Sequence, residues 1–396
     1  MAVPFDPAAA TAAYLSALTP AQHDKATAYT QGGHWVLLWG AIVGVVVAWL
    51  VLKSGVLVRV AGAVERRRPR RNLAVFAVAA AWSLLSFLLG LPWAIYADWW
   101  REKSYGLTSQ ALGGWLGEQV IGLVIGVIGG GLFLMALYAL IRRTGRLWWA
   151  WGAGLAAAFA LLAQVVAPVA IEPLFNRYTP APPSPTRDAV VELAKGTGTP
   201  SDKIFIYNGS KQSNRYTANV SGLGGSARVA MSDVMFAKGA DIAEVRGVVG
   251  HEMGHYKHLH SLWLAGFAAL AAVVLFFLID LLFAPAARAM GAPGLTVGDP
   301  VGLPVLMALL TVLTLLATPV RNTMTRFVES DADRFSLEMA HEPDGLAKAL
   351  VKTTEYRASS PSALEEFVFY DHPSVERRVR RAMDWKAEHL QQAVAR

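Results

Sequence analysis

The stretch "WVLLWGAIVGVVVAWLVL" at 35–52 holds 18 consecutive residues without a charge. A helix needs about 20 mostly apolar residues to cross the hydrocarbon core of a bilayer, so this stretch predicts a membrane span. Comparable runs follow along the chain, and Asp280 is the one charge that interrupts any of them. The sequence therefore predicts six spans, at 35–52, 73–97, 119–141, 147–171, 261–284 and 301–320.

The composition is that of a membrane protein. Of the 396 residues, 54% are hydrophobic and 16% are charged, whereas soluble domains carry about a quarter charged residues. The net charge of +7 is typical of basic residues that anchor spans at the membrane surface, so we expect a lipid bilayer and no nucleic acid as partner. The absence of cysteine excludes a disulfide scaffold, a thiol nucleophile and a cysteine-ligated metal.

Polar segments separate the spans into five regions. The one long polar insert contains "KIFIY" (203–207) and "RVAMS" (228–232), which predict strands, and "SGLGGSA" (221–227), which predicts a turn. Near the start, "SALTPAQHDKATAYTQ" (16–31) predicts a short helix outside the bilayer. The predicted order is an extramembrane N-terminal segment (1–34), four spans (35–171), the insert (172–260), two spans (261–320) and a polar helical C-terminal part (321–396).

The insert contains "VVGHEMGHYKHLH" (248–260), in which His251 and His255 are four residues apart. On a helix such residues share a face, so both imidazoles can bind one metal ion. Glu252 lies about 100° round the helix, where its carboxylate can take a proton from a metal-bound water. Asp241 and Glu244 have the spacing of a capping box, so the helix is predicted to begin near 242 and to run on into the fifth span.

An open catalytic zinc site needs a third protein ligand. The metzincin pattern fails because the chain has His258 and Ser261 where that pattern has glycine and histidine, and the sixth span lacks the aspartate of site-2 intramembrane proteases. The fifth and sixth spans return the chain to the face it left, and Glu329 is the first carboxylate after them. Glu329 is therefore the predicted third ligand. Asp333, one helical turn further on, is predicted to hold a ligand histidine through its second nitrogen.

Three other polar residues have no role in this scheme. For His258 and His260 we expect solvent-facing or interfacial positions rather than metal ligation. Asp280 lies near the far end of the fifth span. It either faces a polar interior, as charged residues in membranes usually do, or pairs with Arg288.

Segments spread over nearly the whole chain resemble the CAAX prenyl protease type I family, the a-factor-converting integral-membrane zinc metalloendopeptidases. The resemblance implies a predominantly α-helical membrane barrel or bundle, in which a small α+β zinc metallopeptidase insert caps a chamber. It also implies one Zn²⁺ per chain, and the composition suggests a bacterial member. The matching segments are "LPWAIYADWWREKSYGLTSQALGGWL" (91–116), "IEPLFNRYTPAP" (171–182), "HEMGH" (251–255), "RFVESDAD" (326–333) and "DHPSVERRV" (371–379).

The resemblance assigns catalytic roles by position. His251, His255 and Glu329 would be the zinc ligands. Glu252 would be the general base, and His372 would stabilise the tetrahedral oxyanion. These roles together imply metal-assisted peptide hydrolysis.

The resemblance also assigns roles outside the metal site. Arg378 would hold the C-terminal segment against the site. The stretch "YTANVSGLGG" (216–225) is similar to the family's edge strand, which would place Ala218 and Asn219 beside the main chain of the substrate. Thr217 departs from this pattern, because the family has asparagine there.

The orientation in the membrane follows from two indications that disagree. Six crossings place both termini and the insert on one face and the strongly basic loop 53–72 on the other, so that loop alone would be cytoplasmic. The resemblance implies instead that the insert faces the cytoplasm, although eukaryotic members have seven spans and the six predicted here would correspond to all but the first. We follow the family, which predicts a catalytic site on the cytoplasmic face of a bacterial inner membrane. The loop carries Lys53, Arg59, Arg66, Arg67, Arg68, Arg70 and Arg71.

The predicted function is zinc-dependent cleavage of peptide bonds near the membrane face, with the capability to process C-terminal CaaX motifs. The expected substrates are peptides or proteins, prenylated or not. One alternative is a quality-control protease with no prenyl requirement, because bacteria are not expected to prenylate such motifs. A non-catalytic membrane scaffold is the remaining alternative, and the intact set of candidate zinc residues weighs against it.

Overall fold

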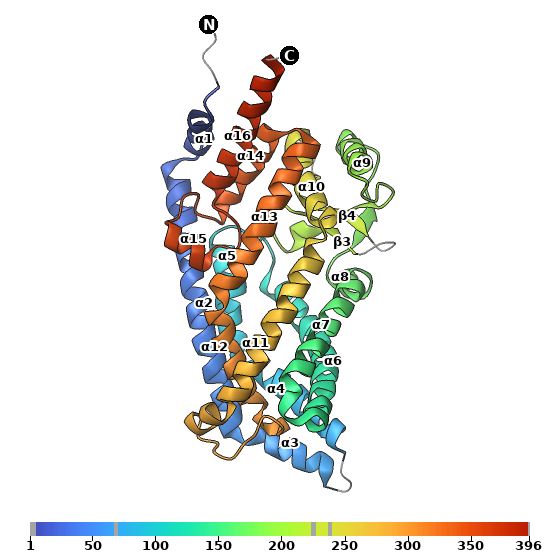
Figure 1. Ribbon diagram of the computed structural model, residues 1–396, viewed down its shortest axis with the longest axis vertical. Coiled ribbons are helices and arrows are strands. Elements are labelled where there is room, and N and C mark those ends of the chain that lie inside the picture. Colours follow the sequence, from blue (N-terminus) through green and yellow to red (C-terminus); the bar gives the residue numbers. More distant parts are fainter. Residues whose placement is uncertain (1–4, 67–69, 223–226, 237–239, 395–396) are drawn as a thin grey trace.

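A computed structural model describes residues 5–66, 70–222, 227–236 and 240–394. The molecule is elongated and mostly helical with one small sheet, and both termini lie at the same end (Figure 1). This confirms the predicted fold class of a helical membrane protein with a small α+β part. Arg67, Arg68 and residues 223–226 of the predicted glycine-rich turn lie outside the described residues.

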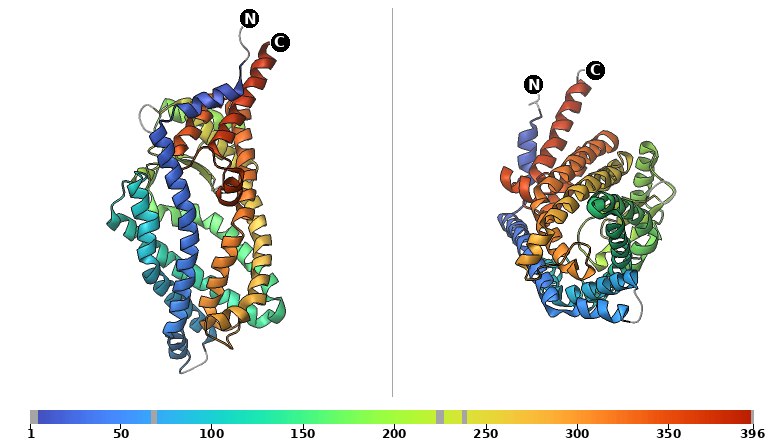
Figure 2. Two further views of the ribbon diagram at one scale, coloured as in Figure 1. Left: turned by 90° about the vertical axis from the view of Figure 1, so that its left-hand side faces the viewer. Right: turned by 60° about the horizontal axis from the view of Figure 1, so that its bottom comes forward.

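Among the described residues, six long helices form a closed ring (Figure 2). Each packs mainly against two neighbours, in the cyclic order α2, α4, α6, α7, α11, α12 and back to α2, and α4 also touches α12. Short helices α3 (Val56–Glu65), α5 (Arg101–Ser104) and α8 (Glu172–Phe175) lie in the connections. The ring helices are α2 (Pro20–Ser54), α4 (Arg71–Ala94), α6 (Leu112–Thr144), α7 (Trp148–Val166), α11 (His260–Ala289) and α12 (Leu303–Leu316).

Four helical stretches of the described chain are long and apolar enough to cross a membrane, or five if one bent pair counts as a span. One of the four, Leu112–Phe175, contains two of the predicted spans, because the chain reverses near Gly145. The rings of Phe133 and Phe159 are 5.4 Å apart, whereas a straight helix between them would be about 39 Å long. Counted this way, the helices overlap all six predicted spans.

The sixth predicted span is bent. α12 ends at Leu316, and α13 (Thr318–Ala340) leaves at an angle of 55°. Pro319 lies in the first turn of α13 and has no backbone N–H, so it cannot continue the hydrogen bonds of α12. The bend directs α13 into the other part of the molecule, where it packs against α10.

Apolar packing holds the ring together around large buried side chains that include Leu137, Tyr138 and Trp148. Asp280 on α11 accepts a hydrogen bond from Nε1 of Trp148 over 2.7 Å. The hydrogen-bond partner of Asp280 in the described structure is therefore an indole on α7, so of the two alternatives the pairing with Arg288 is not the one found.

At one end of the ring lies a polar part that we call the cap, formed by the insert and the C-terminal region (Figure 1). Its four strands are ordered β1-β2-β4-β3, with β2 and β4 parallel and the outer pairs antiparallel. The predicted strands correspond to β2 and β4, and β3 lies at the edge of the sheet. The elements of the cap are β1 (Tyr178–Pro180), α9 (Pro185–Thr197), β2 (Ile204–Tyr207), β3 (Ala218–Ser221), β4 (Arg228–Ser232), α10 (Ile242–Lys257), α14 (Pro343–Lys352), α15 (Ala363–Phe369) and α16 (Val375–Val394), together with the end of α13.

The N-terminal segment differs from the prediction. α1 (Pro7–Ser16) ends where the predicted helix 16–31 begins, and most of that stretch forms the first turns of α2. Thr19 starts α2 with a capping box: its hydroxyl accepts from the Gln22 backbone, and the Gln22 side chain accepts from the Thr19 backbone. Pro20 at the first helical position favours the same start.

The helix that carries the two histidines does not continue into the fifth span, which corrects the prediction. α10 ends at Lys257, Leu259 has a φ of +53°, and α11 begins at His260. Asp241 caps α10 by accepting from the Ala243 backbone over 2.9 Å. Glu244 does not complete a capping box, because its carboxylate contacts Lys352.

Candidate metal centre and active site

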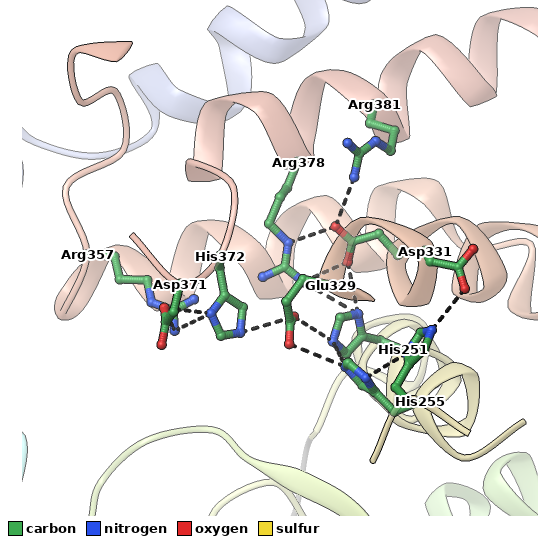
Figure 3. Close-up of polar contacts among 11 residues, drawn as sticks. His251, His255, Glu329, Asp331, Arg357, Asp371, His372, Arg378 and Arg381 are labelled. Atoms are coloured by element: carbon green, nitrogen blue, oxygen red, sulfur yellow. Dashed lines mark hydrogen bonds and ion pairs between the residues drawn. The ribbon is translucent and has the colours of Figure 1, made fainter. Parts of the chain in front are cut away.

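A close approach of α10 and α13 brings the candidate metal ligands together. Gly254 lies on the face of α10 that meets α13, and a Cβ built there would lie 3.0 Å from Cβ of Phe335. A larger residue would push the helices apart, because the neighbour is a buried, closely packed side chain. The approach places His251 and His255 of α10 opposite Glu329 of α13 (Figure 3).

The three side chains converge on one point. The two Nε2 atoms of His251 and His255 are 3.1 Å apart, and they lie 3.2 and 3.4 Å from the two carboxylate oxygens of Glu329. Ligand atoms of all three residues lie within 4.8 Å of one another. Two imidazoles and a carboxylate form a ligand set found in catalytic metal sites that leave a further position open for water. The group could therefore bind one metal ion.

The electrostatics of this group suit a cation. Within the described chain, Oε2 of Glu329 is buried without an assigned hydrogen-bond partner, and it lies 3.2 Å from Nε2 of His251 and 3.0 Å from Nε2 of His372. Burial opposes a charge on His251, but Asp333 and Glu329 outweigh burial and raise the pKa of His251 to about 10. The site thus attracts positive charge. A metal ion would displace the proton from Nε2, since histidine binds metals through an unprotonated ring nitrogen.

The buried ion pair of Asp333 and Arg378 contacts His251 at Nδ1, the ring nitrogen that points away from the candidate metal position. Nδ1 of His251 lies 2.9 Å from Oδ1 of Asp333. Arg378 of α16 donates two hydrogen bonds to the same carboxylate, over 2.8 and 2.6 Å. Such a carboxylate keeps the proton of the imidazole on Nδ1 and leaves Nε2 free to bind a metal. The structure therefore places Asp333 and Arg378 at the site, with Arg378 joining α16 to α13.

Glu252 and His372 line a pocket of about 210 Å³ beside the three candidate ligands. Ala218 at the start of β3 lines the same pocket. Burial raises the pKa of Glu252 above its usual range, although the positive field of the neighbouring histidines opposes this. A carboxylate with a raised pKa is a stronger base, which suits proton transfer near neutral pH.

His372 lies on the opposite side of Glu329 from the two histidines of α10 (Figure 3). Its Nε2 is 3.0 Å from Oε2 of Glu329, and its Nδ1 is 2.8 Å from Asp371 and 3.1 Å from Arg357. Asp371 and Arg357 were missed from the sequence. Asp371 could have been found from its position directly before the signature histidine, whereas Arg357 has no such signal.

The edge strand β3 carries the two predicted substrate-binding residues. Ala218 pairs with Met231 and Asn219 with Ala230 of β4, and no other strand of the described chain covers the opposite side of β3. Oδ1 of Asn219 is buried and has no hydrogen-bond partner among the described residues. An unpaired strand edge is a ready template for an extended peptide.

His258 faces solvent, which was one of the two expected positions, whereas His260 is buried and does not face solvent. His258 is exposed, but His260 is only 5% exposed, and its Nδ1 lies 3.0 Å from Nδ1 of His255. Both histidines contact Asp331, which the sequence reasoning did not select. One signal was available in the sequence. Asp331 comes two residues after Glu329, so on a helix its side chain lies on a different side from the predicted ligand.

Two family models match the chain. The model described as CAAX prenyl protease N-terminal, five membrane helices, matches residues 8–177. The model of Peptidase family M48 matches residues 184–386, which is just over half of the chain and includes all the candidate ligands. The two matches thus divide the chain near the start of the cap.

Individual proteins are similar over most of their length. YhfN, an uncharacterized metalloprotease of Bacillus subtilis (strain 168), is 28% identical over 93% of this chain and 87% of its own. CAAX prenyl protease 1 of Saccharomyces cerevisiae is 25% identical over 77% of this chain and 71% of its own. The crystal structure of S. mikatae Ste24p matches with a TM-score of 0.75 at 20% identity and covers 96% of this chain and 95% of that one, so the two share a fold.

Proposed function

The chain belongs to peptidase family M48 and is an integral-membrane metalloprotease, and we propose that it cleaves peptide bonds with one zinc ion held by His251, His255 and Glu329. Family membership confirms the resemblance seen in the sequence and implies a metal ion. The observation that carries the assignment to these residues is the convergence of two Nε2 atoms and a buried carboxylate on one point. A site of nitrogen and oxygen ligands without cysteine is typical of catalytic zinc in peptidases.

The residues of the site divide the chemistry among themselves. A bound zinc ion would polarise the scissile carbonyl and activate water. Glu252 takes a proton from the attacking water and later passes it to the leaving amine. His372 donates a hydrogen bond to the developing oxyanion, which is typically worth about 3 kcal/mol for one donor. Asp333 and Arg378 keep the ring of His251 in its binding orientation.

The substrate binds as an additional strand on the edge of β3. Main-chain hydrogen bonds of an extended peptide would then run beside Ala218 and Asn219. The pocket that contains Glu252 reaches β3 at Ala218, and a second pocket beside His255 begins at Val220, so β3 runs from one pocket to the other. A peptide on β3 therefore passes the base and the candidate ligands with its backbone extended.

The substrates we propose are membrane-associated peptides and proteins, with C-terminal CaaX processing as one capability. The name of the yeast relative supports this choice, and quality-control proteolysis without a prenyl requirement gains no support from the comparisons. We place the protein in a bacterial inner membrane with the cap facing the cytoplasm. The Bacillus subtilis relative supports a bacterial source, and the resemblance to the family is the basis for the orientation.

The proposal is tested on the full chain purified in detergent, by zinc determination together with cleavage of a quenched peptide. We expect one zinc per chain and chelator-sensitive cleavage. Glu252→Gln should keep the zinc and lower turnover about 10³-fold, because only the proton acceptor is lost. An unaltered protein without zinc, or undiminished turnover by Glu252→Gln, would refute the mechanism. Faster cleavage of a farnesylated peptide than of its unmodified twin supports CaaX processing, and equal rates speak for the alternative.

A further inference from the structure

His255 is connected through its second ring nitrogen to the start of α11 and, beyond it, to α13. Nδ1 of His255 lies 3.0 Å from Nδ1 of His260, and Nε2 of His260 lies 3.1 Å from Oδ2 of Asp331. His260 is buried, whereas Asp331 lies nearer the surface. We propose that His260 and Asp331 are positioning residues for His255, an inference that rests on the metal site proposed above.

The break between α10 and α11 creates this contact. In an uninterrupted helix, residue 260 would lie about 140° round the axis from residue 255 and would face away from it. Leu259 instead adopts a φ of +53°, a conformation that is unfavourable for a residue with a side chain. Leu259 is 48% exposed, so its burial is incomplete and does not compensate for the unfavourable backbone conformation. The strained backbone turns His260 back toward His255, as is typical of strain at functional sites.

Proton positions explain why this arrangement suits a loaded metal site. A metal ion on Nε2 of His255 leaves the ring proton on Nδ1, which donates to Nδ1 of His260. The proton of His260 must then be on Nε2, where it donates to Asp331. Every donor in this series of hydrogen bonds meets an acceptor. His260 and Asp331 therefore fix both the tautomer and the ring orientation in which His255 can bind the metal.

His258, His260 and Asp331 do not form a second metal site while the proposed zinc site is loaded. Ligand atoms of His258, His260 and Asp331 lie within 4.8 Å of one another and could by distance hold an ion. A metal on Nε2 of His260 would move that ring's proton to Nδ1, where it would face the Nδ1 proton of His255 at a nitrogen separation of 3.0 Å. Two donors would then oppose each other, so the geometry points to a hydrogen-bonded support.

The test measures zinc affinity of the full chain in detergent by competition with a chromophoric chelator. His260→Leu removes the acceptor but fills the space, and we expect it to weaken zinc binding 10- to 100-fold, about the usual effect of removing such a partner. His260→Asn places an amide oxygen where it can accept from His255, so we expect it to recover most of the affinity. If His260 served packing alone, His260→Asn would not bind zinc more tightly than His260→Leu.

Two further variants complete the test. Asp331→Ala, at a partly exposed position, should weaken zinc binding by about 10-fold, the low end of that range, and it keeps the proposal testable if His260→Leu does not fold. His258→Ala is the matched control and should bind one zinc with unchanged affinity.

The outcomes separate this proposal from the proposed function. If the unaltered protein binds zinc and cleaves peptide while His260→Leu or Asp331→Ala binds zinc as tightly, the positioning role is refuted and the peptidase stands. Equal weakening in His260→Leu and His260→Asn would also refute it. A second zinc equivalent that disappears in His258→Ala would show that the three residues form a metal site instead. An unaltered protein that binds no zinc would overturn both proposals.

Discussion

The ring and the cap of this protein are stabilised in different ways. In the four stretches of membrane-crossing length, only 11% to 22% of the most apolar window is buried inside the protein, so most of these apolar residues are available for contact with lipid. In the cap, Glu329, Asp333 and Arg378 are charged and at most 7% exposed. Their stability depends on each having its partner, because an unpaired buried charge is costly.

This difference predicts where single substitutions do most damage. An apolar side chain that faces lipid can be replaced by another with little loss, because lipid tails are themselves apolar and fit many shapes. A charged residue of the cap cannot, because its removal leaves a partner buried and uncompensated. The substitutions below run from the centre of the cap outward to the ring.

Glu329→Ala should have the largest effect, because it removes a candidate ligand and leaves His251 and His255 without their carboxylate. We expect zinc affinity to fall by more than about 100-fold, the upper range for residues behind the ligands, and cleavage to be lost. Elemental analysis measures the zinc, with Glu338→Ala on the exposed face of α13 as the control. If Glu329→Ala still held one zinc per chain, the centre of the cap would not depend on this carboxylate.

His372→Ala should reduce kcat by about 10²- to 10³-fold without loss of zinc, since it removes one oxyanion donor and no ligand. Steady-state kinetics with a quenched peptide measure kcat, and His389→Ala on α16 serves as the matched control. A parallel loss of zinc would reveal that His372 supports the metal group itself, and an unchanged kcat would exclude it from the chemistry.

Asp333→Asn should weaken zinc binding 10- to 100-fold, because the amide holds Nδ1 of His251 less well. It should also lower the free energy of unfolding by about 3 kcal/mol, since Arg378 stays buried without its counter-charge. Chelator competition and thermal unfolding measure the two effects. An unfolding temperature equal to that of the unaltered protein would mean that the cap tolerates unpaired charge, and the contrast with the ring would disappear.

Asp280→Ala should have the smallest effect. It removes the acceptor of the Trp148 indole in the ring, which we expect to lower the free energy of unfolding by about 1 kcal/mol and to leave kcat unchanged. Asp280→Asn keeps an acceptor oxygen and should behave like the unaltered protein. A loss above about 3 kcal/mol in thermal unfolding would place polar pairing among the main forces of the ring.

Much of the ring and of the proposed metal site could be predicted from the sequence, because each rests on a regular pattern. Uncharged runs of spanning length gave the crossings, and helical spacing gave the shared face of His251 and His255. Glu329 followed from counting crossings, since two antiparallel spans must return the chain to its starting face. Thr19, Pro20 and Gln22 also form a standard N-terminal signal, but the predicted helix 16–31 did not use it and so missed the start of α2.

The breaks at helix junctions could not be predicted in the same way. Leu259 adopts a positive φ, which leucine disfavours. The residue type at this position therefore gave no indication that α10 ends there. A prediction without that break cannot place His260 next to Nδ1 of His255. The bend before α13 was hidden too, because Pro319 is equally compatible with the first turn of a helix and with a kink. Such junctions are decided by tertiary contacts.

The cyclic order of the ring has a consequence for biosynthesis. Because α2 neighbours α12, the first and the last membrane helices must meet before the ring is complete. Both histidines of α10 are made well before this happens, whereas the carboxylate on α13 emerges only after α12. A nascent chain that has not inserted its final helix therefore lacks one of the three candidate ligands. The proposed three-residue ligand set can therefore be completed only after the chain has been made through Glu329 on α13.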